Sequence, residues 1–218
     1  GDNVEPCAVN VPDGGRDQAF IDLYPSAIPL GCSETTLVSG RLQLIDVNSL
    51  AGLSSVRRVI GSLEFTGLNT AFPDNALIGW SALEEIGGNF AVFDSNIATL
   101  SGFDGLQRVG QLFTVTGNSD LALISGFSQL QSSELDLSIF TNSSLQTVAG
   151  FGSLESVGRS FFMDDHPNLS TVSAFSALRE VLSVFRVSDN ALLADCSTFS
   201  FLLDSSDDAL AGPGTAGP

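Results

Sequence analysis

The fold is decided by three consecutive stretches, which read FTVTGNSDLALISGFSQL (residues 113–130), LSIFTNSSLQTVAGFGSL (residues 137–154) and FFMDDHPNLSTVSAFSAL (residues 161–178). They begin 24 residues apart, and the apolar residues, the Asn or His, and the Gly–Phe or Ala–Phe pair recur at the same positions. A fixed period in the twenties is typical of solenoids, in which each repeat forms one coil of a continuous stack. We therefore predict stacked coils of extended chain.

The same phase continues on both sides of these three copies. A fourth copy opens at Phe185 and then stops, and coils of slightly different length open at Phe90, Leu63 and Leu42. One coil cannot bury its own apolar side, whereas stacked coils share one core and contact only their neighbours. The sequence therefore predicts a mainly β chain, a β-solenoid of about seven coils with a repeat of about 24 residues.

Two columns of residues would run through the interior of such a stack, because equivalent residues of neighbouring coils lie about 4.8 Å apart, the spacing between strands. The first is an aromatic row of Phe103, Phe127, Phe151 and Phe175. The second falls where each strand must bend and contains Asn118, Asn142 and Asn190, with His166 in one coil. At a bend, a side-chain amide can satisfy backbone groups that strand pairing does not reach, and a neutral imidazole can do part of the same.

The repeat resembles that of the receptor L-domain family. The residues that carry the resemblance, most of them with copies 24 residues on, are Val109, Gly110, Phe113, Val115, Asn118, Leu121, Ser125, Gly126 and Phe127. It covers about residues 30–196, with departures at His166, Ala174 and Ser133–Glu134. Members are leucine-rich-repeat-like, right-handed β-solenoids of growth-factor receptor ectodomains, fungal cell-wall proteins and bacterial surface proteins. The resemblance implies a right-handed solenoid that is extracellular or at the cell surface.

The ends of the chain differ in composition from the repeats. Residues 1–36 precede the first clear coil, and the stretch 17–27, with an acidic start and a Pro near its end, predicts a short helical cap. Residues 37–203 are the predicted solenoid, and its apolar last residues, 196–203, predict a C-terminal cap. Residues 204–218 are acidic and then rich in Gly and Pro, which is typical of a linker or of a tail that leads to an anchor beyond it.

The chain has three cysteines, Cys7, Cys32 and Cys196. Cys7 and Cys32 flank the segment before the repeats, and we favour a disulfide between them, which would hold the N-terminal cap and imply an oxidising compartment. The other two pairings stay open, because sequence alone does not choose among them. Cys196 lies on the closing segment, where we expect a buried free thiol.

The charge of the chain restricts its partners. Among 218 residues there are 25 acidic side chains against eight Arg and no Lys, so the formal net charge is −17. Such a surface repels phosphate groups, so we expect neither nucleic acid nor an anionic membrane as a partner. No run of about 18 apolar residues is present, so we expect no transmembrane segment.

Residues for chemistry are few. The chain has one His, so a catalytic Ser–His–Asp set would have to use His166. The cluster Asp164–Asp165–His166 is a poor metal site, because strand alternation directs the two carboxylates to opposite faces and the His stands in the Asn column. We therefore expect no catalytic site, no metal and no cofactor. Paired carboxylates for glycoside cleavage stay an alternative, and surface acids available for them include Glu64, Asp94 and Asp136.

The outward positions of the opening strand of each coil predict an interaction surface. Where the chain is extended, alternate residues point away from the core. Two outward columns then bring three aromatic rings together on a face that is otherwise small and polar, and such a cluster is typical of a binding or assembly surface. The predicted surface consists of Phe93, Thr116, Phe140, Phe162 and Asp164. A loop or tail that covers the rings is the alternative.

One modification site is predicted. Asn142 and Asn168 each begin a sequence that matches the N-glycosylation sequon. Asn142 belongs to the internal column, whereas Asn168 lies in a bend. Asn168 is therefore the predicted acceptor, provided that the source is eukaryotic.

Together these observations predict a non-enzymatic extracellular protein that presents a rigid β face for adhesion, recognition or assembly. Its partner would be a protein or glycan ligand, or copies of itself. Two alternatives stay open: a self-assembling structural subunit of a surface layer or filament, and a carbohydrate-active β-solenoid enzyme. The first would bury the Phe face against another copy, and the second would need two carboxylates converging in a groove. The prediction rests on a family resemblance and on the lack of a catalytic set.

Overall fold

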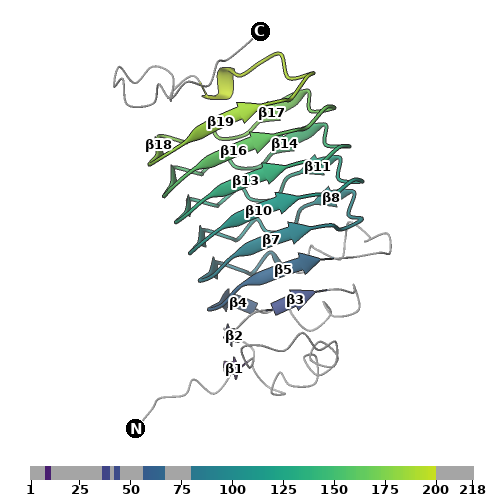
Figure 1. The fold of residues 1–218 in the computed structure, drawn as a ribbon. Helices are drawn as coiled ribbons and strands as arrows, with labels where there is room; N and C mark the ends of the chain where they lie inside the picture. Colours follow the sequence, from purple (N-terminus) through teal and green to yellow (C-terminus); the bar gives the residue numbers. More distant parts are fainter. Residues whose placement is uncertain (1–7, 11–35, 40–41, 45–55, 67–79, 200–218) are drawn as a thin grey trace.

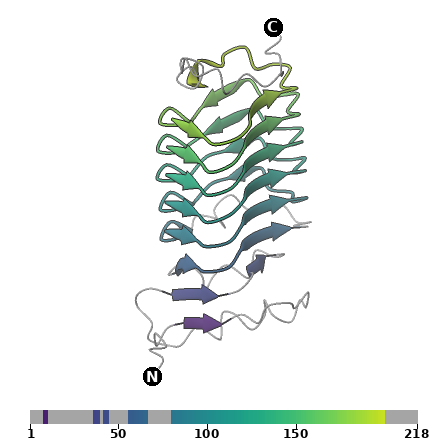
Figure 2. The same ribbon diagram turned by 60° about the vertical axis from the view of Figure 1, so that its left-hand side comes forward.

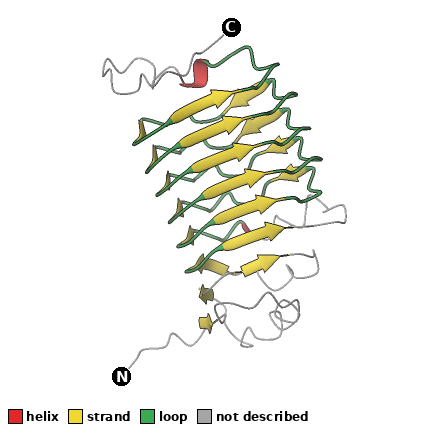
Figure 3. Cartoon of the chain, viewed as in Figure 1, coloured by secondary structure: helices red, strands yellow, loops and turns green. Residues whose placement is uncertain are grey.

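The chain folds as a stack of β-strands. The computed structural model describes residues 8–10, 36–39, 42–44, 56–66 and 80–199 (Figure 1). Strands dominate this part of the chain, and helix is nearly absent from it (Figure 3). η3 (Ser197–Phe199), a single 3-10 turn, follows the last coil at the C-terminal end of the stack. No helix of the described residues is both long enough and apolar enough to cross a membrane.

The strands form three parallel sheets, and each complete coil adds one strand to each of them (Figure 2). The eight-stranded sheet contains β1 (Ala8–Asn10), β2 (Thr36–Ser39), β4 (Val56–Val59), β6 (Glu85–Ile86), β9 (Arg108–Val109), β12 (Ser132–Ser133), β15 (Ser156–Val157) and β18 (Glu180–Val181). The seven-stranded sheet contains β3 (Leu42–Leu44), β5 (Leu63–Thr66), β7 (Phe90–Phe93), β10 (Phe113–Thr116), β13 (Leu137–Phe140), β16 (Phe161–Asp164) and β19 (Phe185–Ser188). The four-stranded sheet contains β8 (Thr99–Leu100), β11 (Leu123–Ile124), β14 (Thr147–Ala149) and β17 (Thr171–Ser173).

The strands pair in the register that the sequence repeat predicts. Successive strands of the seven-stranded sheet align Phe90, Phe113, Leu137, Phe161 and Phe185. Pairing continues outside this sheet, where the backbone N–H groups of Gln131 and Glu155 donate to the carbonyl oxygens of Gln107 and Gln131, each at 2.8 Å. The predicted β-solenoid is confirmed: about five turns follow a spacing of about 24 residues, and β3 and β5 extend the same sheet.

Aromatic rings fill the core. The predicted aromatic row is confirmed. The ring centroids of consecutive members lie 5.0 to 5.3 Å apart along the row of Phe103, Phe127, Phe151 and Phe175. The row continues to Trp80, 6.1 Å from Phe103, and to Phe199 of η3, 5.7 Å from Phe175. A second row meets the first edge to face and includes Phe90, Phe113 and Phe161. Such ring pairs each contribute about 0.5–1.5 kcal/mol beyond burial, so the two rows join neighbouring coils firmly.

The predicted asparagine column is also confirmed, and its side chains are bonded on both sides. The side-chain oxygen of Asn118 accepts from the backbone N–H of Ser95 at 3.0 Å, and that of Asn142 accepts from the N–H of Asn118 at 3.0 Å. The Nδ2 of Asn118 donates to Val92 O at 3.1 Å. Each amide thus satisfies buried backbone groups of neighbouring coils, whose desolvation would otherwise be costly.

His166 makes the same bonds as the asparagines that it replaces. Its Nδ1 accepts the backbone N–H of Asn142 at 3.2 Å, and its Nε2 lies 3.1 Å from Ile139 O. Because a carbonyl oxygen only accepts, the proton of the neutral ring sits on Nε2. The side chain is fully buried, and this burial lowers the pKa of His166 against the opposing hydrogen bonds to Ile139 and Asn142. A neutral imidazole therefore completes the column.

Each of the coils that contain β7, β10, β13, β16 and β19 turns through a left-handed residue directly after that strand. The φ angles of these residues lie between +50° and +69°, and the residues are Asp94, Gly117, Thr141, Asp165 and Asp189. Gly takes this conformation freely and Asp tolerates it, whereas a β-branched Thr does so rarely. This corner places exposed carboxylates along one edge of the sheet.

A second left-handed position explains one departure from the repeat. Gly102, Gly126 and Gly150 have φ values of +86°, +79° and +84°. In the next coil Ala174 stands where these glycines do, and Phe175 takes the positive φ instead, at +61°. The change from Gly to Ala therefore moves the turn by one residue and leaves the coil in place.

Some predictions concern residues outside the described part of the chain, namely the helix over 17–27, the Cys7–Cys32 disulfide and the tail over 204–218. Cys196 is a free cysteine as predicted, but the prediction that its thiol is buried was wrong, because the residue is exposed. The chain runs over the surface before η3, and the core position that ends the aromatic row is taken by Phe199.

Candidate binding face

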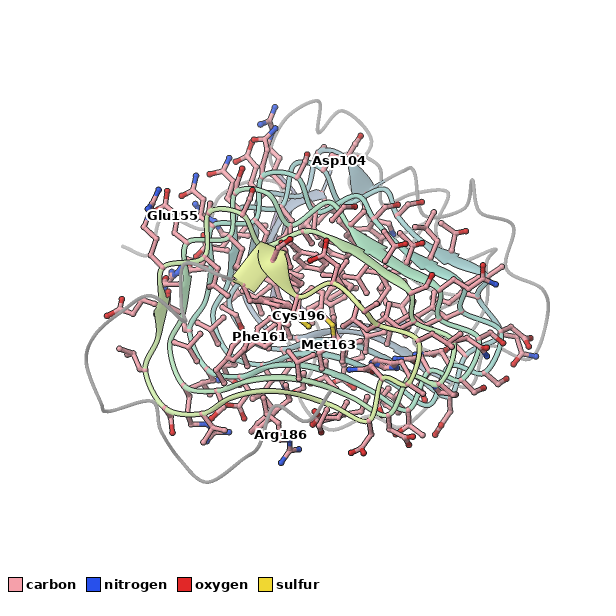
Figure 4. All side chains as sticks on the ribbon, turned by 90° about the horizontal axis from the view of Figure 1, so that it is seen from above. Asp104, Glu155, Phe161, Met163, Arg186 and Cys196 are labelled. Carbon is pink, nitrogen blue, oxygen red and sulfur yellow. The ribbon has the colours of Figure 1, made fainter. Side chains whose placement is uncertain are left out.

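The predicted interaction surface lies on the outer side of the seven-stranded sheet. Seen along the stack, Phe161 and Met163 of β16 point into the core, whereas Arg186 of β19 points away from it (Figure 4). The two outward columns are in register as predicted. One contains Glu64, Ala91, Thr114, Ser138, Phe162 and Arg186. The other contains Phe93, Thr116, Phe140, Asp164 and Ser188.

Phe140 and Phe162 form the aromatic centre of this face. Their ring centroids are 5.8 Å apart, their planes are inclined by 29°, and both residues are half-buried. Phe93 stands in the same column as Phe140, but Thr116 of the intervening strand separates them. Two strand spacings amount to about 9.6 Å. The structure therefore brings two of the three predicted aromatic residues together and leaves Phe93 apart.

Arg186 extends the aromatic centre by one coil. Its guanidinium carbon lies 4.8 Å from the centroid of the Phe162 ring, which is within the range of a cation–π interaction. Nε donates to Asp164 Oδ2 at 2.7 Å, and Nη2 lies 2.6 Å from the same oxygen. These bonds to Asp164 raise the pKa of Arg186, so it keeps its charge. We refer to Phe140, Phe162 and Arg186 as the aromatic platform.

Asp164 holds the platform in place and is not itself an exposed part of the surface. It is 6% exposed, and both of its carboxylate oxygens are bonded. Oδ1 accepts the backbone N–H of Ser188 at 3.0 Å and the Ser188 hydroxyl at 2.8 Å. The carboxylate therefore neutralises Arg186 and fixes its orientation over Phe162.

The surroundings of the platform are hydroxyl-rich on one side and acidic on the other. Thr114 and Thr116 are half-buried beside it, and their hydroxyls make no hydrogen bond within the described part of the chain. Asp165 and Asp189 are exposed at the left-handed corner of the same sheet. The face thus offers π surfaces, free hydroxyls and one paired guanidinium, next to an edge that repels anions.

A polar groove on the eight-stranded sheet was not found by sequence analysis. It has a volume of about 370 Å³ and is lined by Arg58, Glu84, Glu85, Gln107, Arg108, Gln131 and Ser132. Glu85 joins two coils here, because its carboxylate oxygens lie 3.1 Å from Arg58 Nε and 3.1 Å from Arg108 Nη1. The charges of the groove cancel, and its ion pairs connect neighbouring coils.

The acids considered for catalysis occupy different places in their coils: Glu64 lies in β5, Asp94 follows β7 and Asp136 precedes β13. Arg159 binds both carboxylate oxygens of Asp136, and this pairing holds the pKa of Asp136 below its usual range. A general acid for glycoside cleavage needs a raised pKa instead. Asp136 is therefore a structural ion-pair partner.

The cluster at residues 164–166 does not gather around a common point. Asp164 binds Arg186, Asp165 is exposed at the corner, and His166 is buried in the asparagine column. Among the described residues, no group of three or more His, Cys, Asp or Glu side chains is arranged to hold a metal ion.

The two sequon asparagines differ in exposure. Asn142 is fully buried, which excludes it as an acceptor in the folded chain. Asn168 is exposed, and its Nδ2 donates to Ser143 O at 2.8 Å. Glycosylation of Asn168 stays a prediction, and a glycan there would share this nitrogen with the bond to Ser143.

Comparisons with known proteins add no relative. A scan against protein-family models finds no matching family, and neither the curated proteins nor the solved structures contain a match. The assignment of function therefore rests on the geometry of the chain itself.

Proposed function

We propose that this protein is a non-enzymatic extracellular or cell-surface protein of receptor L-domain type, which binds a ligand through the outer side of its seven-stranded sheet. The observation that carries the proposal is the aromatic platform. Two stacked, half-buried Phe rings lie beside an Arg that a buried carboxylate fixes in place. Aromatic and Arg side chains are the ones that most often dominate the energy of recognition.

The solenoid makes this surface rigid. β13 and β16 are each paired on both sides, so the backbone under Phe140 and Phe162 is held by neighbouring strands. Asp164 removes the rotational freedom of Arg186 before any ligand arrives. A surface ordered in advance loses less conformational entropy on binding, which favours recognition or adhesion by this face.

A structural subunit that assembles end to end is the second candidate. At the last coil Leu182, Val184 and Leu192 are 65%, 45% and 57% exposed, and β19 is the edge strand of its sheet. An open edge strand with apolar neighbours favours pairing with another chain. This observation concerns the end of the stack, where β19 carries Arg186 of the platform, and it does not involve Phe140 or Phe162.

Adhesion of coated beads tests the first proposal. Beads carrying the parent chain, the double variant Phe140→Ser/Phe162→Ser or the control Phe93→Ser would be compared on surfaces of purified cell-wall and matrix polysaccharides and proteins. We expect the parent and the control to adhere to the same surface and the double variant to lose that adhesion. Equal adhesion by all three chains would show that the aromatic platform does not carry the adhesion and would overturn the proposal.

Sedimentation velocity tests the second candidate. We expect the parent to be a monomer, unchanged by the double Phe substitution. Large particles that dissociate in the variant Val184→Ser/Leu192→Ser would establish assembly through the end of the stack. Large particles that dissociate instead on substitution of Phe140 and Phe162 would make the sheet an assembly contact.

A further inference from the structure

The chemistry of the aromatic platform indicates which class of ligand it binds, and this inference rests on the proposed function. The size of the apolar surface is the first guide. An aromatic side chain has about 150–250 Å² of surface, and Phe140 and Phe162 are each more covered than exposed, so the two rings together expose on the order of 100 Å². A standard protein–protein interface buries about 800 Å² on each partner. The exposed rings alone are far smaller than the patch that a protein partner covers, and they match the footprint of one or two small rings.

The hydrogen-bonding groups around the rings are the second guide. Arg186 is half-exposed, and a guanidinium has more N–H donors than the two nitrogens that bind Asp164 use. The hydroxyls of Thr114 and Thr116 are also free of bonds within the described chain. A ligand that covers the rings therefore meets donors and acceptors around its edge. This combination suits a ring with an apolar face and a rim of hydroxyl groups.

Charge is the third guide. Asp164 neutralises Arg186, and the exposed Asp165 and Asp189 lie at the adjacent corner in a chain of net charge −17. An anionic ligand would gain little net attraction from a guanidinium whose charge Asp164 already balances, and it would be repelled by the corner. The surface therefore disfavours an anionic ligand.

We propose that the aromatic platform binds a neutral saccharide. The C–H groups on one face of a sugar ring carry small positive charges, and they pack against the exposed parts of the Phe140 and Phe162 rings, beside Arg186, which lies over one face of Phe162. The hydroxyl groups of the sugar accept from the free N–H groups of Arg186 and exchange hydrogen bonds with Thr116. Successive sugars of one polysaccharide chain would bind along the strands, and this protein would thereby attach to a polysaccharide surface.

Titration calorimetry with defined oligosaccharides tests the inference. A panel of neutral oligosaccharides and matched oligosaccharides that contain uronic acids would be titrated into the full chain. We expect at least one neutral oligosaccharide to bind, and its acidic counterpart to bind more weakly. Phe162→Ser and Phe140→Ser are each expected to weaken binding roughly tenfold or more, whereas Phe162→Tyr, which keeps the ring, retains it.

Two matched controls separate the outcomes. Phe93→Ser removes an aromatic ring from the same sheet outside the platform, and Gln131→Ala changes the polar groove on the eight-stranded sheet. Both are expected to bind as the parent does. Binding that is lost with Gln131→Ala and kept with Phe162→Ser would place the saccharide in the groove and overturn the inference. If no oligosaccharide binds while the double Phe variant still loses bead adhesion to a protein surface, the saccharide inference fails and the proposed function stands.

Discussion

His166 is the one residue of the asparagine column whose charge can change near neutral pH. In the fold, its Nδ1 must stay unprotonated because it accepts the backbone N–H of Asn142, and burial lowers the pKa of His166 below its ordinary value of 6.5. Above pH 6.5 the ring is neutral in both folded and unfolded chains. As the pH falls through 6.5, the unfolded chain takes up a proton that the folded chain refuses, so stability is lost on the acid side.

Replacement of His166 by Asn isolates this contribution. Asn keeps the bonding pattern of Asn118 and Asn142 but does not titrate, so the variant should lose less stability than the parent as the pH falls. We expect the difference in the free energy of unfolding between variant and parent to grow below pH 6.5 by up to about 1.4 kcal/mol per pH unit, the limit for one proton. Urea unfolding of both chains at a series of pH values from neutral to mildly acidic measures it. If the free energies of unfolding of the two chains fell in parallel as the pH is lowered, the folded chain would take up the proton on His166 as readily as the unfolded chain, and the prediction would be wrong.

The aromatic row is the element that joins the coils, and its two ends differ from its middle. Phe127 stacks between Phe103 and Phe151, whereas Phe199 stacks on Phe175 on one side only and meets rings of the last two coils edge to face. Coils of a solenoid contact only their neighbours, so damage at the end should stay there. We expect Phe127→Ala to lower the free energy of unfolding by about 3–5 kcal/mol.

For Phe199→Ala we expect faster amide hydrogen exchange in β18 and β19, with β10 as protected as in the parent. Native-state exchange, measured residue by residue, distinguishes the two variants. If Phe199→Ala speeds exchange in β10 as much as in β19, the stack opens as a single unit and the local account of the row is wrong.

The parts of this element that repeat were predictable, and the parts that do not repeat were not. Phe127 and Asn118 were placed in their columns by the 24-residue period, because stacked coils put equivalent residues on one line. Phe199 stands 24 residues after Phe175 but lies in a 3-10 turn without the rest of the repeat. Only the packing of its ring against Phe175 shows that it ends the row.

The candidate site was predictable to the same extent. Strand alternation placed Phe140 and Phe162 on one face, but it also suggested an exposed Asp164. Asp164 is buried because Arg186, 22 residues later, folds back onto it, and the choice of rotamer that forms this pair is not a property of the repeat. The polar groove was missed for a related reason. Arg58 and its partner Glu85 are 27 residues apart, which is longer than the 24-residue period, so the charged positions do not recur visibly in the sequence.

At the scale of the whole molecule, two electrostatic effects oppose each other. The net charge of −17 makes the compact chain repel itself. Ion pairs between coils, such as those of Arg108 with Glu85 and Glu134, act in the other direction. The side chains of Arg108 and Glu134 are about half exposed and that of Glu85 is less so, and pairs this open to solvent contribute only about 0–1 kcal/mol each. The long-range repulsion involves many more charges, so it should dominate.

Added salt should therefore stabilise this protein. Between about 20 mM and about 0.5 M NaCl the Debye length falls from about 20 Å to about 4 Å, which screens the distant repulsion more completely than the close ion pairs. We expect the Tm from calorimetry to rise over this range. Arg108→Gln removes one compensating cation, so this variant should start lower at low salt and gain more as salt is added. The same rise in KCl would assign the effect to screening, whereas a Tm that falls with salt would mean that the ion pairs between coils outweigh the net charge.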